Sequence, residues 1–174
     1  MSKKSLGIEG PDFLARQPWR LAKRQRFNVI IVDTSVWIDF FHGKNSPEVH
    51  TLERILVEGK DVCICGVILA EVLQGIREDG DYRATLSRFE SFLFLPMNQH
   101  TFVKAAELYR ILRHKGITIR NTVDCMIAAV AIEHDIPLLH KDRDFNPIAE
   151  YCGLKTPEKP TKASRILPPR HGKS

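Results

Sequence analysis

Asp33 is the first acidic side chain that stands where it could do chemistry. It follows directly after the run Asn28–Val32, which is mostly apolar and rich in β-branched residues. Such a run, short and without polar alternation, predicts a strand covered on both faces, as in a parallel sheet between helices. Open α/β sheets place their sites at the carboxyl ends of their strands. Asp33 could equally serve only as the cap of the helix expected after it.

Two further acids occur early in predicted helices. Glu71 lies in the second turn of a helix expected over residues 66–78, beside its apolar stripe and not opposite it. Asp124 lies in the first turn of a helix that we expect Thr122 to cap, where the helix dipole favours a negative charge. Both helices follow connections at the edge where Asp33 is expected. Taken alone, Glu71 is better explained as a partly solvated helix residue.

Asp142 comes just after the strand expected over residues 136–140, and Asp144 stands two positions later. Since the carboxyl ends of parallel strands share one edge of a sheet, carboxylates from distant stretches should converge there. Without a counter-charge they would repel each other and raise one another's pKa values. The acids expected to share the site are Asp33, Glu71, Asp124 and Asp142.

Oxygen ligands alone define the chemistry that this group could perform. Hard carboxylate ligands suit Mg²⁺ or Mn²⁺, so no His or Cys is needed. A divalent ion held by acids is the usual arrangement for phosphodiester hydrolysis, in which the ion activates a water, orients the phosphate and stabilises the leaving oxygen. The acids therefore predict metal-dependent cleavage of a phosphodiester.

Strands and helices must alternate if these acids are to meet, and residues 28–152 show that alternation. It predicts an α/β fold: a three-layer α/β/α sandwich with helices on both faces of a mostly parallel central sheet. The remaining expected elements are strands over 61–65 and 92–96 and helices over 36–43, 47–59, 82–92, 101–114 and 146–152.

Charge divides the chain of 174 residues into three parts. Residues 28–152, the predicted domain, carry a net charge of −5, whereas the extension over 1–27 and the proline-rich tail over 153–174 each carry +5. An acidic domain with basic ends could bind a polyanion through the ends while a metal neutralises an acidic pocket. Simple solubilising tails explain the same charges equally well.

Hydropathy and cysteine usage exclude several classes of protein. No apolar run approaches the roughly 18–20 residues that a membrane span needs, and no apolar stretch follows Lys3 and Lys4 as a secretory signal would require. The cysteines lack paired zinc-type spacing, so we expect buried, reduced thiols and a cytoplasmic protein.

Four sequence blocks, in this order and spacing, resemble the PIN-domain ribonucleases, and within them the VapC-type toxins. They are VDTSVWIDF, ILAEVLQG, TVDCMIAAVA and LLHKDRDF, and they span about residues 28–152. The resemblance implies a Mg²⁺- or Mn²⁺-dependent endoribonuclease that is the toxin of a toxin–antitoxin pair. It also implies a small cognate antitoxin as partner and a homodimer. The long amino-terminal extension departs from the family and leaves open how an antitoxin docks.

The resemblance also assigns roles to individual residues. Asp33 and Asp124 match the principal metal ligands, and Glu71 and Asp142 complete the acidic quartet. Asp144 matches either an alternative ligand of the metal or an acid that supports the ligands. Ser35 matches the small hydroxyl that contacts an acid or the phosphate. No position of the quartet has lost its acid, so nothing indicates an inactive enzyme.

Arg120 and Lys141 are two cations that we add as substrate-binding residues, because their positions bring them to the same edge. A phosphate would attract both side chains. A solvated surface role is nearly as well supported for each of them.

Two other functions remain compatible with the sequence. One is an Asp-based phosphotransfer domain with Asp33 as the phosphorylated nucleophile, although Ser35 stands where haloacid-dehalogenase-type phosphatases want a second Asp. The other is a non-catalytic RNA- or protein-binding module that uses its acids only as caps. A stable acyl-phosphate on Asp33 would favour the first, and the lack of a tight divalent site would favour the second.

Overall fold

The computed structural model describes residues 29–157. The predicted extension over 1–27 and the tail from residue 158 onward lie outside the described residues, so the predicted domain boundaries remain predictions. Residues 153–157 pack against the sheet. The side chain of Leu154 is buried, and the Lys155 carbonyl accepts a hydrogen bond of 2.9 Å from the Leu138 amide.

The central sheet confirms the predicted parallel arrangement. Its strands are β1 (Val29–Val32), β2 (Asp61–Cys65), β3 (Leu93–Leu95) and β4 (Leu138–Leu139). They run in the order β3-β2-β1-β4, and each neighbouring pair is parallel. The Asp33 amide donates a hydrogen bond of 2.9 Å to the Leu139 carbonyl. The residues that follow β1 and β4 are therefore held side by side at one edge.

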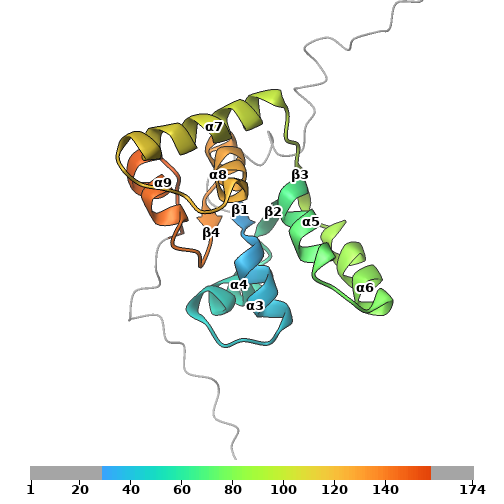
Figure 1. Cartoon of the computed structure of the whole chain (residues 1–174). Helices are drawn as coiled ribbons and strands as arrows, with labels where there is room; N and C mark the ends of the chain where they lie inside the picture. Colours follow the sequence, from blue (N-terminus) through green and yellow to red (C-terminus); the bar gives the residue numbers. More distant parts are fainter. Residues whose placement is uncertain (1–28, 158–174) are drawn as a thin grey trace, which may run out of the picture.

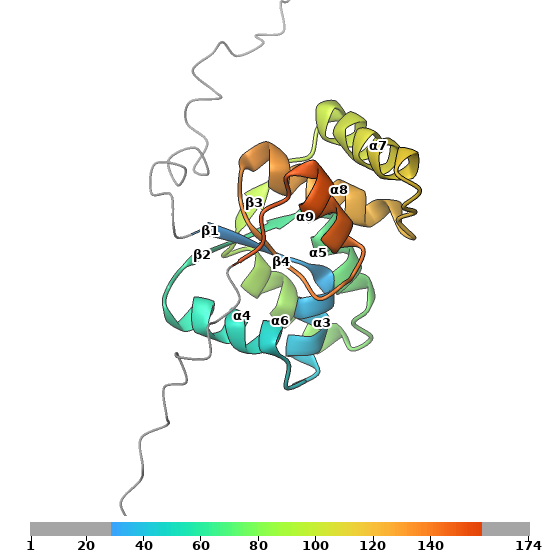
Figure 2. The ribbon, with the colours of Figure 1, turned by 90° about the vertical axis from the view of Figure 1, so that its left-hand side faces the viewer.

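Helices cover both faces of the sheet, as the fold class predicted (Figures 1 and 2). They are α3 (Thr34–Phe41), α4 (Pro47–Val57), α5 (Gly66–Gln74), α6 (Asp79–Phe89), α7 (Gln99–His114), α8 (Thr122–His134) and α9 (Phe145–Cys152). Helices α7, α8 and α9 pack together on one face, and α3 and α4 pack together on the other. Helix α5 contacts both α3 and α8, so it links the two layers.

Two of the helices that carry site residues begin with side-chain caps, whereas α5, which carries Glu71, begins without one. Asp33 caps α3 by accepting from the Ser35 amide. Asn121, and not Thr122 as expected, caps α8 by accepting from the Val123 amide at 3.1 Å. The prediction was one residue late because Asn and Thr are both good caps and stand next to each other.

An aromatic cluster forms the core beneath α3. Trp37 is 2 % exposed, and its ring centroid lies 5.0 Å from that of Phe89 and 5.4 Å from that of Phe92. On the opposite face, α8 is buried around most of its circumference, with Ala128 and Ala129 fully buried. Small side chains there let α8 approach its neighbours closely. Packing thus fixes both α3, which directly follows Asp33, and α8, which carries Asp124.

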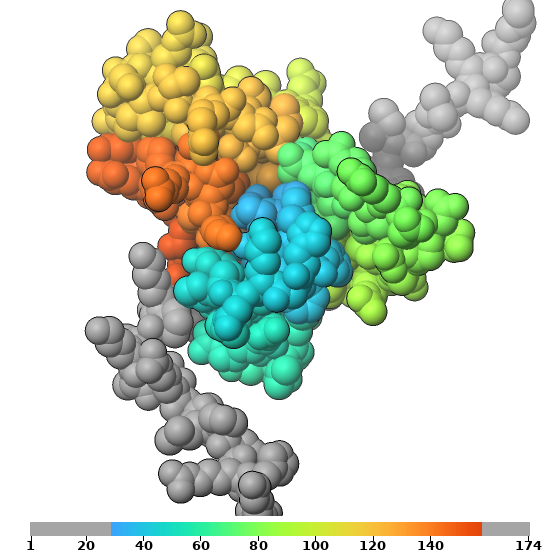
Figure 3. Space-filling model, turned by 60° about the horizontal axis from the view of Figure 1, so that its bottom comes forward, coloured from blue at the N-terminus to red at the C-terminus, as the bar shows by residue number. Residues whose placement is uncertain are grey.

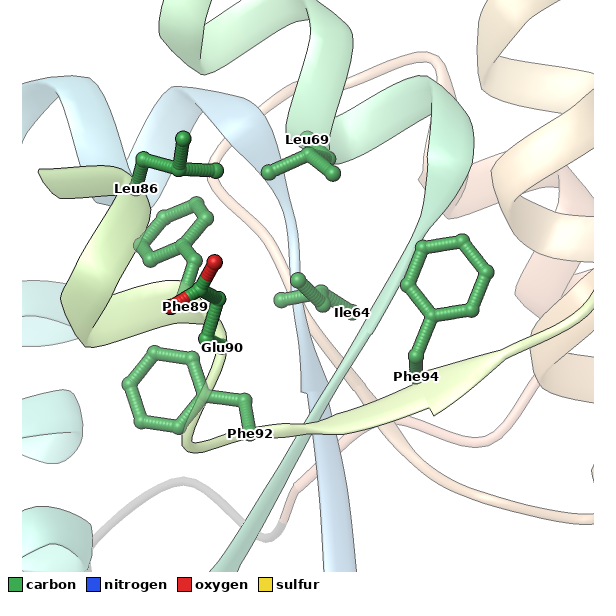
Figure 4. Close-up of a pocket in the computed structure, with 7 residues that line it drawn as sticks. All are labelled: Ile64, Leu69, Leu86, Phe89, Glu90, Phe92 and Phe94. Atoms are coloured by element: carbon green, nitrogen blue, oxygen red, sulfur yellow. The ribbon is translucent and has the colours of Figure 1, made fainter. Parts of the chain in front are cut away.

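A small apolar cavity of about 250 Å³ lies between α5, α6 and the strands β2 and β3 (Figure 4). Aliphatic and aromatic side chains line it, and Glu90 is the one ionisable side chain in its wall. This cavity shares no residue with the predicted acidic site, and it opens to the surface beside the exposed Phe94.

Two further features concern hydropathy and the cysteines. No helix among residues 29–157 is long and apolar enough to cross a membrane. Cys63, Cys65 and Cys125 are buried and Cys152 is partly buried, and none of them forms a disulfide.

Candidate active site

Asp33 stands at the carboxyl end of β1 and is only 4 % exposed. Its Oδ2 accepts hydrogen bonds from both the amide and the hydroxyl of Ser35. Burial raises the pKa of Asp33, and these two hydrogen bonds oppose that rise in part. Asp33 therefore caps a helix and also belongs to the acidic site, so the two readings of this residue are compatible.

Glu71 on α5 reaches the same edge through Thr34. The Thr34 hydroxyl donates a hydrogen bond of 2.7 Å to Glu71 Oε2, across 37 positions of sequence. The contact joins the first turn of α3 to the second turn of α5. Glu71 is half-buried and has a specific partner, and its role at this edge stays a prediction. Thr34 went unnoticed in the sequence because its direction depends on where α5 lies.

Asp124 has a raised pKa, to which burial and the negative charges of nearby carboxylates contribute. Burial is the largest cause that raises its pKa to about 7, and the charges of other carboxylates add to it. Those carboxylates, in decreasing order of effect, belong to Asp142, Asp33, Asp144 and Glu71. Since charge–charge effects are strong only over short separations, this pattern indicates that the five acids share one region.

Arg120 lies directly against two of these acids. Its Nε is 3.2 Å from Asp144 Oδ2, and its guanidinium NH2 is 3.2 Å from Asp142 Oδ1. The Arg120 amide also donates to Asp144 at 3.0 Å, and the Asp144 amide donates to Asp142 at 3.0 Å. Figure 3 shows this face, with the segment of α3 (blue) between the segment that follows β4 (orange) and α5 (green).

The Lys141 side chain pairs with an acid outside the predicted site. Its ammonium forms an ion pair with Asp39 on α3, and Lys44 pairs with the same carboxylate at 2.7 Å. Asp39 is buried, and its hydrogen bonds to the two lysines lower its pKa. Of the two cations expected at the phosphate, the structure brings Arg120 to the acids and assigns Lys141 a different partner. The substrate role of both residues stays a prediction.

His140 was missed by sequence reasoning. Its Nδ1 donates a hydrogen bond of 2.9 Å to the Asp142 carbonyl, and its ring lies 4.9 Å from that of Phe145. Burial lowers its pKa, while the nearby charge of Asp33 acts in the opposite direction. A histidine directly after the strand 136–140 was the available signal. Carboxylates alone satisfy the expected metal chemistry, so nothing in the sequence indicated a role for His140.

The donor set fits a hard divalent ion, although its present arrangement is held by the protein's own groups. Asp33 binds a hydroxyl of Ser35, Glu71 binds one of Thr34, and Asp142 and Asp144 bind Arg120. Within residues 29–157, no three Asp, Glu, His or Cys side chains are placed to hold one ion jointly. The other carboxylates nevertheless repel the ionised form of Asp124, and a bound cation would relieve that repulsion.

A scan against protein-family models matches the PIN domain over residues 30–151. The chain belongs to the PIN-domain family. Among curated relatives, ribonuclease VapC11 of Mycobacterium tuberculosis is 35% identical over 73% of this chain and 96% of its own length. This similarity places the chain in the VapC group of PIN domains, as the four sequence blocks predicted.

Solved structures agree with the PIN fold. A structure of VapBC2 from Rickettsia felis, bound to a promoter DNA fragment, matches with a TM-score of 0.59 and 19% identity, over 74% of this chain and 97% of the other. FitAcB from Neisseria gonorrhoeae matches with a TM-score of 0.58 and 20% identity, over 73% of this chain and 95% of the other. At these identities the likeness concerns the fold alone.

Proposed function

We propose that this protein is a metal-dependent endoribonuclease and the toxin of a toxin–antitoxin pair. The observation that carries the proposal is the convergence of four carboxylates on a fifth, Asp124, at the carboxyl edge of the sheet. The raised pKa values of Asp33 and Asp124 are typical of acids in a catalytic site that takes a cation. The relatives named VapC ribonuclease indicate that the substrate is RNA.

Mg²⁺ or Mn²⁺ would be held mainly by Asp33 and Asp124. Glu71 and Asp142 would complete the set, with Asp144 as a further acid. When bound, the ion would lower the pKa of a water, polarise the phosphate and stabilise the leaving oxygen. This chain's own residues orient the ligands: Ser35 fixes Asp33, and Thr34 fixes Glu71.

The proposed reaction is hydrolysis of one phosphodiester bond. A water oxygen forms a new bond to phosphorus, and the bond from phosphorus to the 3′-oxygen breaks. The attacking water loses a proton and the leaving 3′-oxygen gains one, so the products carry a 5′-phosphate and a 3′-hydroxyl. In-line attack requires that the phosphate be held still, which the carboxyl edge of a rigid sheet provides.

Asp124→Asn tests the proposal directly. We expect purified wild-type protein to cleave RNA with Mn²⁺ or Mg²⁺ and to stop when the ion is chelated. The variant should cleave more than about 100-fold more slowly than wild type. Loss of a residue that only supports a metal ligand typically costs about 10- to 100-fold. Gel analysis of a defined RNA, with sequencing of the product ends, measures both the rate and the chemistry.

Asp61→Asn is the matched control. Asp61 is exposed and stands at the opposite end of a strand of the same sheet, so its removal should leave cleavage unchanged. If wild type and Asp124→Asn cleaved RNA at the same rate, the activity would come from a contaminating nuclease, and this result would contradict the proposal. A stable acyl-phosphate on Asp33 would favour phosphotransfer instead.

The partner proposed for this toxin is a small antitoxin. The solved structures that share the fold include VapBC2, FitAcB and a toxin–antitoxin complex from Klebsiella pneumoniae. We expect the product of a small neighbouring reading frame to co-purify with the protein and to suppress cleavage. Light scattering would show whether the toxin alone is the homodimer that the family resemblance predicts.

A further inference from the structure

Arg120 is the cation that stands nearest to the acids of the site. Its side chain bridges Asp142 and Asp144, with contacts from Nε and from one terminal nitrogen. Hydrogen bonding to Asp144 and the charges of both acids raise the pKa of the guanidinium, so it is a permanent positive charge. Arg120 thus already supplies one of the counter-charges that the acids need.

Arg120 contacts Asp142 and Asp144, but within residues 29–157 it makes no hydrogen bond to Asp33 or Glu71. Asp142 Oδ1 accepts from both the Arg120 side chain and the Asp144 amide, and both oxygens of Asp144 face Arg120. The other two acids, Asp33 and Glu71, are held by hydroxyl groups. A divalent ion that uses Asp142 or Asp144 must therefore compete with a guanidinium.

The bridge is also easy to displace. The Arg120 side chain is 73% exposed, whereas those of Asp142 and Asp144 are 36% and 14% exposed. Exposed ion pairs contribute little net stability because water solvates both partners well when they separate. A doubly charged ion attracts the same carboxylates more strongly than a guanidinium does. Arg120 can therefore rotate into solvent without unfolding its surroundings.

We propose that Arg120 is a displaceable counter-cation of Asp142 and Asp144, and that it sets the divalent-ion concentration at which the site fills. The inference rests on the proposed metal dependence of this site. Arg120 is then a positioning residue: it keeps the acidic loop in place while no ion is bound. Once displaced, its side chain is free to meet the substrate phosphate, the role predicted from its position.

Mn²⁺ binding to the full-length protein without RNA tests the inference, measured by calorimetry and by loss of the free-ion paramagnetic resonance signal. We expect Arg120→Ala to bind Mn²⁺ about three- to tenfold more tightly, because one competing and repelling charge is gone. Arg120→Lys keeps the positive charge but loses the planar guanidinium that contacts both acids. Its affinity for Mn²⁺ should therefore lie between those of wild type and Arg120→Ala. Arg88→Ala, which removes an exposed arginine on α6, should match wild type.

A spectroscopic readout distinguishes displacement from a merely structural role. During a Mg²⁺ titration, the ¹⁵Nε resonance of Arg120 should move with saturation towards the position typical of a solvated arginine. That of Arg88 should stay fixed. Thermal melts of the variants confirm that each is folded before binding is compared.

The possible failures are separable. Tight Mn²⁺ binding by wild type, with equal or weaker binding by Arg120→Ala, would overturn this inference and leave the proposed function standing. An Arg120 resonance that stays fixed while the ion binds would do the same. If wild type and Asp124→Asn both failed to bind Mn²⁺, the proposed function and this inference would fall together.

Discussion

At the scale of single residues, the main feature of the site is the repulsion between its carboxylates. Asp124 is 8 % exposed and sits among other carboxylates, so its ionised form is costly in the metal-free protein. The protein reduces this cost in part with Arg120, which engages two of the neighbouring acids. A bound divalent ion would remove the rest, so the electrostatic state should depend on both pH and metal.

The first prediction concerns pH and Asp124. Its carboxyl group has a pKa of about 7 in the folded chain and 3.8 as the reference value for an exposed group. The folded state therefore binds its proton more tightly, and stability falls as pH rises from about 4 through about 7. The charged groups that act on it are Asp33, Glu71, Asp142, Asp144 and Arg120.

Urea unfolding with a chelator present, for wild type and Asp124→Asn, measures this effect. The two should differ least near pH 4, and the variant should be the more stable by roughly 1–2 kcal/mol above pH 7, after allowance for solvent screening. Saturating Mg²⁺ should remove or reverse the difference, since only wild type keeps the full ligand set. A difference that does not vary with pH would contradict the assigned pKa.

At the scale of elements, packing holds the acids in place. Helix α8 carries Asp124 in its first turn and contacts α5, α7 and α9. Its buried small residues allow these close contacts, and a protein interior has little spare volume. Helix α3 is held in turn by Trp37, whose ring is packed among other aromatic rings. Precise positions for the carboxylates therefore depend on side chains that never touch an ion.

Ala128→Leu is the second prediction. The larger side chain has no room at this fully buried position, so it should lower the free energy of unfolding by about 1–3 kcal/mol. Chemical denaturation monitored by circular dichroism measures the change. Val57→Leu, at a residue 88% exposed on α4, should stay within about 0.5 kcal/mol of wild type. Equal stability of all three proteins would show that α8 is loosely packed.

At the scale of the whole molecule, the charge of the domain works against its proposed substrate. Residues 28–152 carry a net charge of −5, and RNA is a polyanion. The two sequence ends carry +5 each, so the favourable long-range electrostatics of RNA binding must come from them. We expect catalysis to belong to the domain and much of the RNA affinity to belong to the ends.

Removal of both ends is the third prediction. A fragment of residues 29–157 should bind Mn²⁺ as the full chain does, since every acid of the site is retained. Its RNA affinity at about 100 mM salt should fall at least roughly tenfold, with a flatter dependence of log K on log salt, because fewer counterions are released. Fluorescence anisotropy with an RNA oligonucleotide measures this, and circular dichroism checks the fold. An unchanged salt slope would assign the ends a different role.

The acid positions illustrate what local pattern can predict. Asp33 and Asp142 directly follow short apolar runs, and Glu71 and Asp124 occur early in amphipathic or capped helices, so their shared edge follows from the parallel topology. Strand ends and helix starts depend on neighbouring residues, which the sequence displays directly. The local errors shift boundaries and move no acid of the site: the α8 cap is Asn121 and not Thr122, the helix expected over 82–92 lies over Asp79–Phe89, and the helix expected over 66–78 ends at Gln74.

The sequence by itself determined the fold class and the family, because these depend on periodicity and on the order of motifs, and it named the acids that we propose for the site. Only the tertiary structure decided which cation meets which acid. Lys141 reaches Asp39 across 102 positions of sequence, and Arg120 bridges Asp142 and Asp144 although its side chain remains largely exposed. Long side chains choose their partners by distance in space, and that distance is fixed only when the elements have packed together.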